Sequence, residues 1–158
     1  MNRTAVHVSG RLRSRRPFVF VGVACALAAC EAPALPEHAP ILELGAVVAQ
    51  LPAGARIHEV RVGAAAPTPE LDPDTVRARP GDVVRFTAAG TGMHAIAFDA
   101  AALDAAAGSF LSAGQQLRGP PLLAAGASWV VSLEGAPAGA YPFLCITHGV
   151  RGILHVAP

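Results

Sequence analysis

Near the C-terminus, an alternating apolar run ends in a cysteine that is followed three residues later by a histidine. Residues 139–148 read Gly-Ala-Tyr-Pro-Phe-Leu-Cys-Ile-Thr-His, and a second histidine, His94, lies about fifty residues upstream. A strand end and the tight loop after it can aim Cys145 and His148 at one point, whereas His94 must come from elsewhere in the fold. The spacing therefore predicts a β-architecture that brings two distant strand ends together.

The alternation of side chains predicts which strand faces are buried. Successive residues of a strand point to opposite faces, so we expect His94 to point with the large apolar side chains of a strand at Met93–Phe98. By the same rule, Cys145 should share a buried face with the aromatic side chains of a strand at Tyr141–Cys145. Both candidate ligands are therefore expected to point into the core.

Other segments carry local signals of their own. Turn residues at short intervals from about residue 56 onward indicate a β-sandwich, with strands at Ser128–Leu133 and Gly152–Val156. The last of these strands should leave His155 in solvent. Residues 74–87 alternate on both sides of a Pro-Gly-Asp turn, which indicates a hairpin with one buried face. A short helix is predicted at Ala100–Ala107.

A thiolate and two imidazoles form a soft, three-ligand set of the kind that holds copper for electron transfer. The trigonal plane that they define is acceptable to both Cu(I) and Cu(II), so little rearrangement accompanies a change of redox state. Ile96, Phe98, Phe143 and Val150 are suited to keep water away from such an ion. His38 and His58 have no partner at a useful spacing.

The motif around Cys145 resembles that of the cupredoxins, the small blue copper proteins such as plastocyanin and pseudoazurin. Their pattern, Gly-x-Tyr-x-Phe-x-Cys-x-x-His followed by a Met and a Gly, is matched here in every element except the Met. The resemblance covers roughly residues 56–157. It implies an all-β Greek-key sandwich that holds one type 1 copper ion on His94, Cys145 and His148. It also implies that His148 is the partly exposed ligand through which electrons leave.

The departure from the family pattern concerns the fourth ligand. After His148 the chain reads Gly-Val-Arg-Gly-Ile, in which Val150 lies nearest to the position of the missing Met and Ile153 is the next alternative. Met93 precedes His94 in a predicted strand and should point to the opposite face, although its carbonyl oxygen can approach the metal. A hydrocarbon at the fourth position leaves Cu(II) less stabilised, so we expect a high reduction potential.

The N-terminal region has the composition of an export signal. Five arginines precede the short apolar run Phe18–Ala29, which is too short to span a bilayer, and small residues follow. Residues 27–30, Leu-Ala-Ala-Cys, resemble the bacterial lipobox, in which the cysteine, here Cys30, becomes the lipid-modified first residue. Residues 14–19 resemble the twin-arginine export motif. We therefore expect an exported, lipid-anchored protein that is periplasmic or on the cell surface.

The predicted organisation is a signal peptide at 1–29, a Pro/Ala-rich linker at 30–55 and a copper-binding domain at 56–158. A strand or a helical turn is expected within Ile41–Leu51. Because Cys25 lies in the apolar run and Cys30 is the candidate lipid site, Cys145 is the one thiol left in the domain, which excludes a disulfide there. Beyond residue 30, seven arginines face eleven acids, a net charge of −4 that does not suggest a nucleic-acid partner.

We expect an electron carrier rather than an enzyme, acting as a monomer between redox proteins. One alternative is a protein that sequesters or delivers copper, and another is a degenerate cupredoxin domain with weak copper affinity. A nucleophile and base made of Cys145 and His148 is disfavoured, since no Asn or Asp is placed to orient the imidazole. Multicopper oxidase chemistry is disfavoured because the chain has no His-x-His motif.

Overall fold

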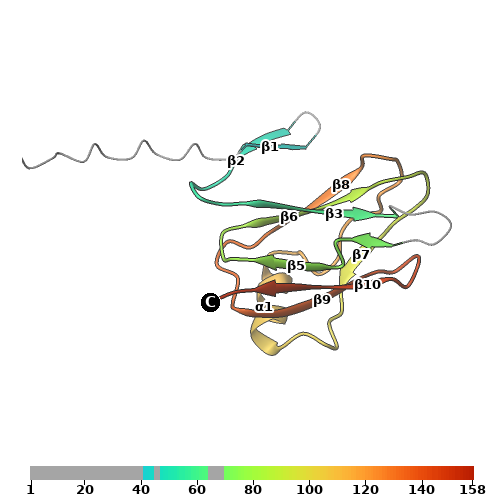
Figure 1. Ribbon diagram of the computed structural model, residues 1–158. Helices are drawn as coiled ribbons and strands as arrows, with labels where there is room; N and C mark the ends of the chain where they lie inside the picture. Colours follow the sequence, from blue (N-terminus) through green and yellow to red (C-terminus); the bar gives the residue numbers. More distant parts are fainter. Residues whose placement is uncertain (1–40, 45–46, 64–69) are drawn as a thin grey trace, which may run out of the picture. The chain divides into compact units, whose positions relative to one another are not determined.

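The computed structural model of the protein describes residues 41–44, 47–63 and 70–158. Most of its strands belong to two four-stranded sheets (Figure 1). The predictions of a signal peptide, of lipid attachment at Cys30 and of a twin-arginine motif lie outside the described residues, as does His38. The linker predicted at 30–55 is described only from residue 41 onward.

The first sheet contains β4 (Leu71–Asp72), β3 (Ile57–Val62), β6 (Val83–Ala88) and β8 (Ser128–Ser132), in that order. Strands β3 and β6 run parallel, and both outer pairs are antiparallel. Because β3 and β6 are parallel neighbours, the chain between them must cross over, and it does so through β5 in the other sheet.

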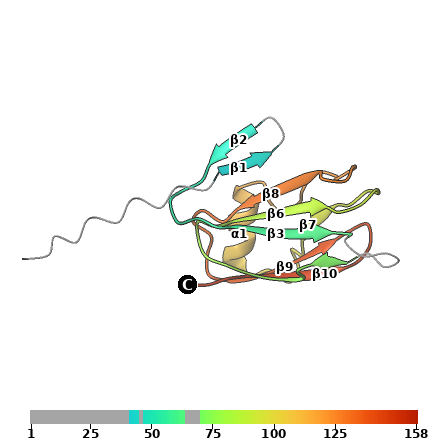
Figure 2. The same cartoon turned by 45° about the horizontal axis from the view of Figure 1, so that its top comes forward.

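The second sheet contains β5 (Thr75–Ala78), β10 (Arg151–Val156), β9 (Gly139–Cys145) and β7 (Ile96–Phe98). Strand β10 pairs with β5 in parallel and with β9 antiparallel, and β9 pairs with β7 antiparallel. Figure 2 shows this sheet lying against the first one. The predicted all-β sandwich is confirmed.

Aromatic side chains from both sheets meet in the core between them. The Phe86 ring from the first sheet lies edge-on to the Phe143 ring from the second, with centroids 5.1 Å apart, and stacks on Trp129 at 5.5 Å. Tyr141 is fully buried, and its hydroxyl donates a hydrogen bond of 2.6 Å to the carbonyl of Pro137, the arrangement of a tyrosine corner. The predicted burial of Tyr141, Phe143 and Cys145 on one face is confirmed.

The hairpin predicted at residues 74–87 is wrong. Strands β5 and β6 do show the predicted alternation of buried side chains, but they belong to different sheets. The turn at residues 79–82 crosses between the sheets, and the buried Asp82 carboxylate holds it by accepting hydrogen bonds from the backbone N–H groups of Arg56 and Arg79, each 2.9 Å long. Turn chemistry fixes a reversal of the chain, whereas more distant strands decide which sheet each arm joins.

Helix α1 spans Ala105–Ala113, so the helix predicted at Ala100–Ala107 begins too early. The side chain of Asp104 caps the helix by accepting the N–H of Ala107 at 2.7 Å, which fixes its first turn. Ala107 and Leu111, one turn apart, are buried against the core. No helix among the described residues has the length and apolar character needed to cross a membrane.

Residues 41–50 contain a strand, as expected, and in fact a pair. Strands β1 (Ile41–Leu44) and β2 (Val47–Gln50) are antiparallel, with Ile41 opposite Gln50. The Glu43 carbonyl accepts a hydrogen bond of 3.2 Å from the Arg85 side chain of β6. Part of the region that was predicted as a linker therefore forms strands, and these strands contact the first sheet.

Candidate metal centre

Cys145 is the last residue of β9, and the turn that follows carries His148. The Cys145 carbonyl accepts hydrogen bonds from the N–H groups of His148 (3.2 Å) and Gly149 (2.8 Å), and its own N–H donates to the carbonyl of Val150 (2.9 Å). Gly149 has a φ of 71°, in the region that favours glycine. These bonds close a tight turn in which cysteine and histidine, three residues apart, lie side by side.

His94 reaches the same place from a different part of the chain. It lies just before β7, so the strand expected at Met93–Phe98 is shorter than predicted and begins at Ile96. Two hydrogen bonds with Leu122 hold the His94 backbone in an isolated bridge, one of 3.0 Å from the His94 N–H and one of 2.8 Å to its carbonyl. The Ile146 N–H also donates to the Ala95 carbonyl at 2.7 Å, which ties the ends of the two strands together.

The three candidate side chains converge. The Sγ atom of Cys145 lies 3.4 Å from Nδ1 of His148 and 4.0 Å from Nδ1 of His94. One donor atom from each of the three residues lies within 4.8 Å of the others. Bonds of about 2.0 Å to nitrogen and about 2.3 Å to sulfur, at trigonal angles, require roughly 3.7 Å between nitrogen and sulfur. The two observed separations bracket that value, so the cluster has the dimensions of a metal site.

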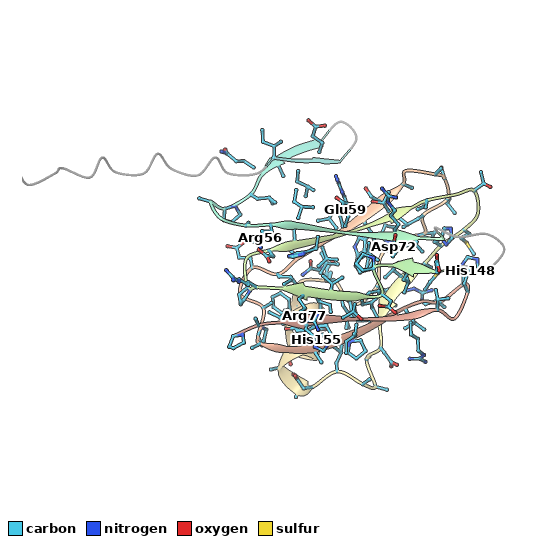
Figure 3. All side chains as sticks on the ribbon, in the orientation of Figure 1. Arg56, Glu59, Asp72, Arg77, His148 and His155 are labelled. Atoms are coloured by element: carbon cyan, nitrogen blue, oxygen red, sulfur yellow. The ribbon has the colours of Figure 1, made fainter. Side chains whose placement is uncertain are left out.

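Burial divides the three residues in a way that matters for chemistry. Cys145 is fully buried and His94 is 5% exposed, whereas His148 is exposed. Burial lowers the pKa of His94, and the neighbouring His148 lowers it further. The His94 imidazole is therefore favoured in its neutral form, which is the form that binds a metal. Figure 3 shows His148 at the end of the sandwich where β9 turns into β10.

The candidates for the fourth position behave differently. Val150 is half-buried and packs against the core beside the turn. Met93 is 51% exposed, and the chain's other methionine is Met1. Ile153 pairs with Pro142, whose side chain alternates with the inward Tyr141 and Phe143, so Ile153 lies on the outer face, away from the sulfur. Phe143 is buried in the core two residues before Cys145.

Three exposed apolar side chains, called the apolar rim here, stand next to residues of the cluster or to Leu122, the bridge partner of His94, in the sequence. Met93, Leu123 and Ile146 are 51%, 69% and 43% exposed, and each is adjacent to His94, Leu122 or Cys145 in sequence. Leu123 was missed because residues 100–127 carried no recognised functional signal. Pro120 and Pro121, just before Leu122, favour an extended backbone, and this is the signal in the sequence that could have indicated a strand-like segment here.

The two other histidines that the structure describes do not belong to the cluster. His58 lies near the start of β3, where its Nε2 is 2.8 Å from the Asp82 carboxylate. His155 is exposed on β10 opposite Arg77 of β5, as Figure 3 also shows. The prediction that His155 lies in solvent is confirmed.

No family model matches the sequence, and no curated protein matches it. Among solved structures, a mutant plastocyanin of fern is similar with 24% identity and a TM-score of 0.50, over 63% of this chain and 99% of that chain. A purple cupredoxin from Nitrosopumilus maritimus aligns over the same shares, with 18% identity and a TM-score of 0.47. A Cu-containing nitrite reductase from Thermus scotoductus has 16% identity and a TM-score of 0.50, over 75% of this chain and 25% of that one. The chain has the cupredoxin β-sandwich fold.

Proposed function

From a cupredoxin fold that gathers one cysteine and two histidines, we propose that this chain is an electron-transfer protein carrying one type 1 copper ion on His94, Cys145 and His148. The observation that carries the proposal is the convergence of a sulfur and two imidazole nitrogens at 3.4 and 4.0 Å. The ion supplies one-electron chemistry when it is bound. Thiolate and imidazole together are a donor set that suits copper in both oxidation states.

The protein's own part is to hold these donors still. Cys145 ends a strand that is paired on both sides, with β7 and β10, and the His94 backbone is fixed by its bonds to Leu122. Because the backbones of both residues are held by hydrogen bonds to neighbouring segments, we expect the sulfur of Cys145 and the Nδ1 atom of His94 to keep one arrangement in both redox states. A small structural change on oxidation or reduction supports fast electron transfer.

The exposed imidazole of His148 supports a role as the exit for electrons. His94 and Cys145 are buried, so His148 is the member of the cluster whose ring edge reaches solvent. The apolar rim of Met93, Leu123 and Ile146 is suited to brief contact with a redox protein, because a weak apolar contact forms and releases quickly. We propose that the physiological partners are redox proteins that dock on this rim.

The fourth coordination position is proposed to lack a sulfur ligand. Met1 and Met93 are the chain's two methionines, and the side chain of Met93 is half exposed beside the buried His94. The half-buried Val150 is the proposed neighbour of the metal, with the Met93 carbonyl as a weak contact from the other side. This arrangement supports a high reduction potential, since an axial donor stabilises Cu(II) more than Cu(I).

Export and anchoring complete the proposal. The arginine-rich leader, the short apolar run and Cys30 support transfer across the cytoplasmic membrane followed by lipid attachment. Labelling with a fatty-acid analogue tests this part: incorporation should depend on Cys30 and vanish in Cys30→Ser. Incorporation that persists in Cys30→Ser contradicts the lipid anchor and leaves the copper site unaffected.

A second candidate is copper sequestration or delivery, which the missing axial donor favours. The two functions differ in electrochemistry. If the copper-loaded protein is an electron carrier, voltammetry should give a reversible one-electron wave. Electron self-exchange between two copies of the protein should also be fast. A bound ion that shows no reversible wave, and that passes readily to a competing chelator, supports delivery instead.

A further inference from the structure

Gly63 directly follows β3 and approaches the candidate metal centre from the opposite sheet. The cluster residues belong to the second sheet, since Cys145 ends β9 and His94 lies just before β7. Gly63 instead continues β3, one of the two central strands of the first sheet, and its N–H donates a hydrogen bond of 2.8 Å to the carbonyl of Glu70. The cluster is therefore built where the ends of both sheets meet.

The approach of Gly63 to His94 leaves no room for a side chain. A Cβ atom added to Gly63 would lie 2.6 Å from Cε1 and 2.9 Å from Nε2 of the His94 imidazole, and 3.6 Å from Nδ1. Separations below 3.0 Å essentially never occur for real Cβ atoms. The backbone of Gly63 thus lies against the Cε1–Nε2 edge of the ring, while Nδ1 is the ring nitrogen that lies 4.0 Å from the Cys145 sulfur.

The imidazole has little freedom to move away from Gly63. Its backbone is fixed by the two hydrogen bonds with Leu122, and the residue is 5% exposed. The ring of His148 lies beside the ring of His94, and the centroids of these two rings are 4.8 Å apart. A displacement of the ring by an added methyl group would therefore move Nδ1 relative to the sulfur.

We propose that Gly63 is a positioning residue for the metal site. Its missing side chain lets the end of β3 brace the ring of His94, so that the separation of the His94 nitrogen from the Cys145 sulfur is set by the packing of the two sheets. The spectroscopic consequences rest on the proposed copper-binding function. The contact itself does not depend on a metal and can be measured without one.

Gly63 also has a backbone reason to be glycine, since its φ is +78°. Two other glycines separate this effect from contact with His94. Gly126 has a φ of +80° and Gly54 a φ of +82°, and a Cβ on either would meet nothing within 4 Å. Substitution by alanine at these three positions imposes the same backbone strain, and at Gly63 alone of the three it also meets the His94 ring.

The experiment compares Gly63→Ala with Gly126→Ala and Gly54→Ala in the full chain. We expect the Cu(II) absorption spectrum and the electron paramagnetic resonance hyperfine splitting to change in Gly63→Ala and to stay as in the wild type in both controls. Copper affinity should fall by about 10- to 100-fold in Gly63→Ala alone, the size of effect that supporting residues have on metal sites. Spectra and affinity that match those of the controls overturn the proposal.

A metal-free measurement separates this proposal from the proposed function. In the apo protein, a nuclear Overhauser effect is expected between the His94 Hε1 proton and the Gly63 Hα protons. Its absence overturns the positioning role. If the wild type instead shows this contact but gives no charge-transfer band with Cu(II), the proposed type 1 function fails while the contact stands.

A double-mutant cycle covers the case in which Gly63→Ala folds poorly. His94→Ala removes the ring that the new methyl group would meet, so Gly63→Ala should lower the melting temperature less in the His94→Ala background than in the wild type. Equal losses in the two backgrounds mean that the ring and the glycine do not interact, which contradicts the proposal. The cycle needs no copper and is measured by thermal unfolding of the apo variants.

Discussion

Cys145 lies directly opposite Ile96 in the pairing of β9 with β7, and Ile96 is two residues from His94, which lies just before β7. The Ile146 N–H, bonded to the Ala95 carbonyl at 2.7 Å, continues this pairing past the end of β9. The register of two strands therefore sets how the backbones of Cys145 and His94 lie relative to each other. The position of His148 depends on the turn that follows.

Val150→Met tests which side chain caps the metal. Val150 is half-buried beside the ligand turn, and a thioether there would donate to the metal and favour Cu(II). We expect the reduction potential to fall by about 59 mV or more, since 59 mV corresponds to a tenfold change in relative affinity for a one-electron couple. Voltammetry checks the shift. An unchanged potential shows that Val150 does not face the ion, and directs attention to the Met93 carbonyl.

The apolar rim is tested through electron self-exchange, which requires two copies to touch near His148. Leu123→Glu places a negative charge on the rim, so two copies that meet rim to rim should repel each other. Electron self-exchange should therefore slow at least tenfold at low ionic strength. Ala140→Glu, at the exposed start of β9, is the matched control. Line broadening in nuclear magnetic resonance spectra of mixed redox states measures the rate. Equal rates in both variants would show that contact occurs elsewhere.

Asp82 makes the stability of the fold depend on pH. Burial raises the pKa of Asp82, but the hydrogen bonds from His58 and from the backbone of Arg79 and Arg56 outweigh it, so the pKa lies below its usual value of 3.8. The carboxylate thus stabilises the folded state fully above the unfolded pKa, and this contribution disappears as the pH falls through the lower folded pKa.

Asp82→Asn should cost about 1–3 kcal/mol at pH 7, because the substitution leaves buried hydrogen-bond donors with a weaker partner. The difference between wild type and variant should shrink as the pH falls below about 4. Urea unfolding of the apo protein over this pH range measures both free energies. A constant difference across the range contradicts the assigned role of the carboxylate.

Two glycines should respond in opposite directions to the same substitution. A Cβ on Gly152 would lie 2.5 Å from the Phe143 ring and 2.6 Å from the Asp74 carbonyl oxygen, so Gly152→Ala should destabilise the fold by about 1–3 kcal/mol. Gly108 lies within α1, with ordinary contact of 4.0 Å to Leu103. Gly108→Ala should stabilise the fold by up to about 1 kcal/mol. Thermal unfolding checks the signs, and a stabilising Gly152→Ala would contradict the packing.

The predictions that succeeded rest on local periodicity. Alternation along residues 139–145 placed Cys145 on the buried face, and the three-residue step to His148 is short enough that a turn alone determines it. The place of His94 beside them followed from chemistry, because one thiol and two imidazoles at this spacing have few other uses in a sandwich.

The predictions that failed concern choices made by distant segments. The turn after β5 was recognised from its residues, but β5 pairs with β10 and β6 with β3, and nothing local specifies those partners. Gly63 was missed for a similar reason. A glycine leaves no pattern in the sequence, and its value depends on a ring that lies in the opposite sheet.

The central claim is that Cys145, His94 and His148 bind one copper ion through the sulfur and two nitrogens. The most direct test is the visible and electron paramagnetic resonance spectrum of the reduced-thiol protein after addition of one equivalent of Cu(II). We expect an intense thiolate-to-copper charge-transfer band that Cys145→Ser abolishes. A colourless wild-type protein whose thiol is shown to be reduced, or a band that survives in Cys145→Ser, would contradict the proposed site.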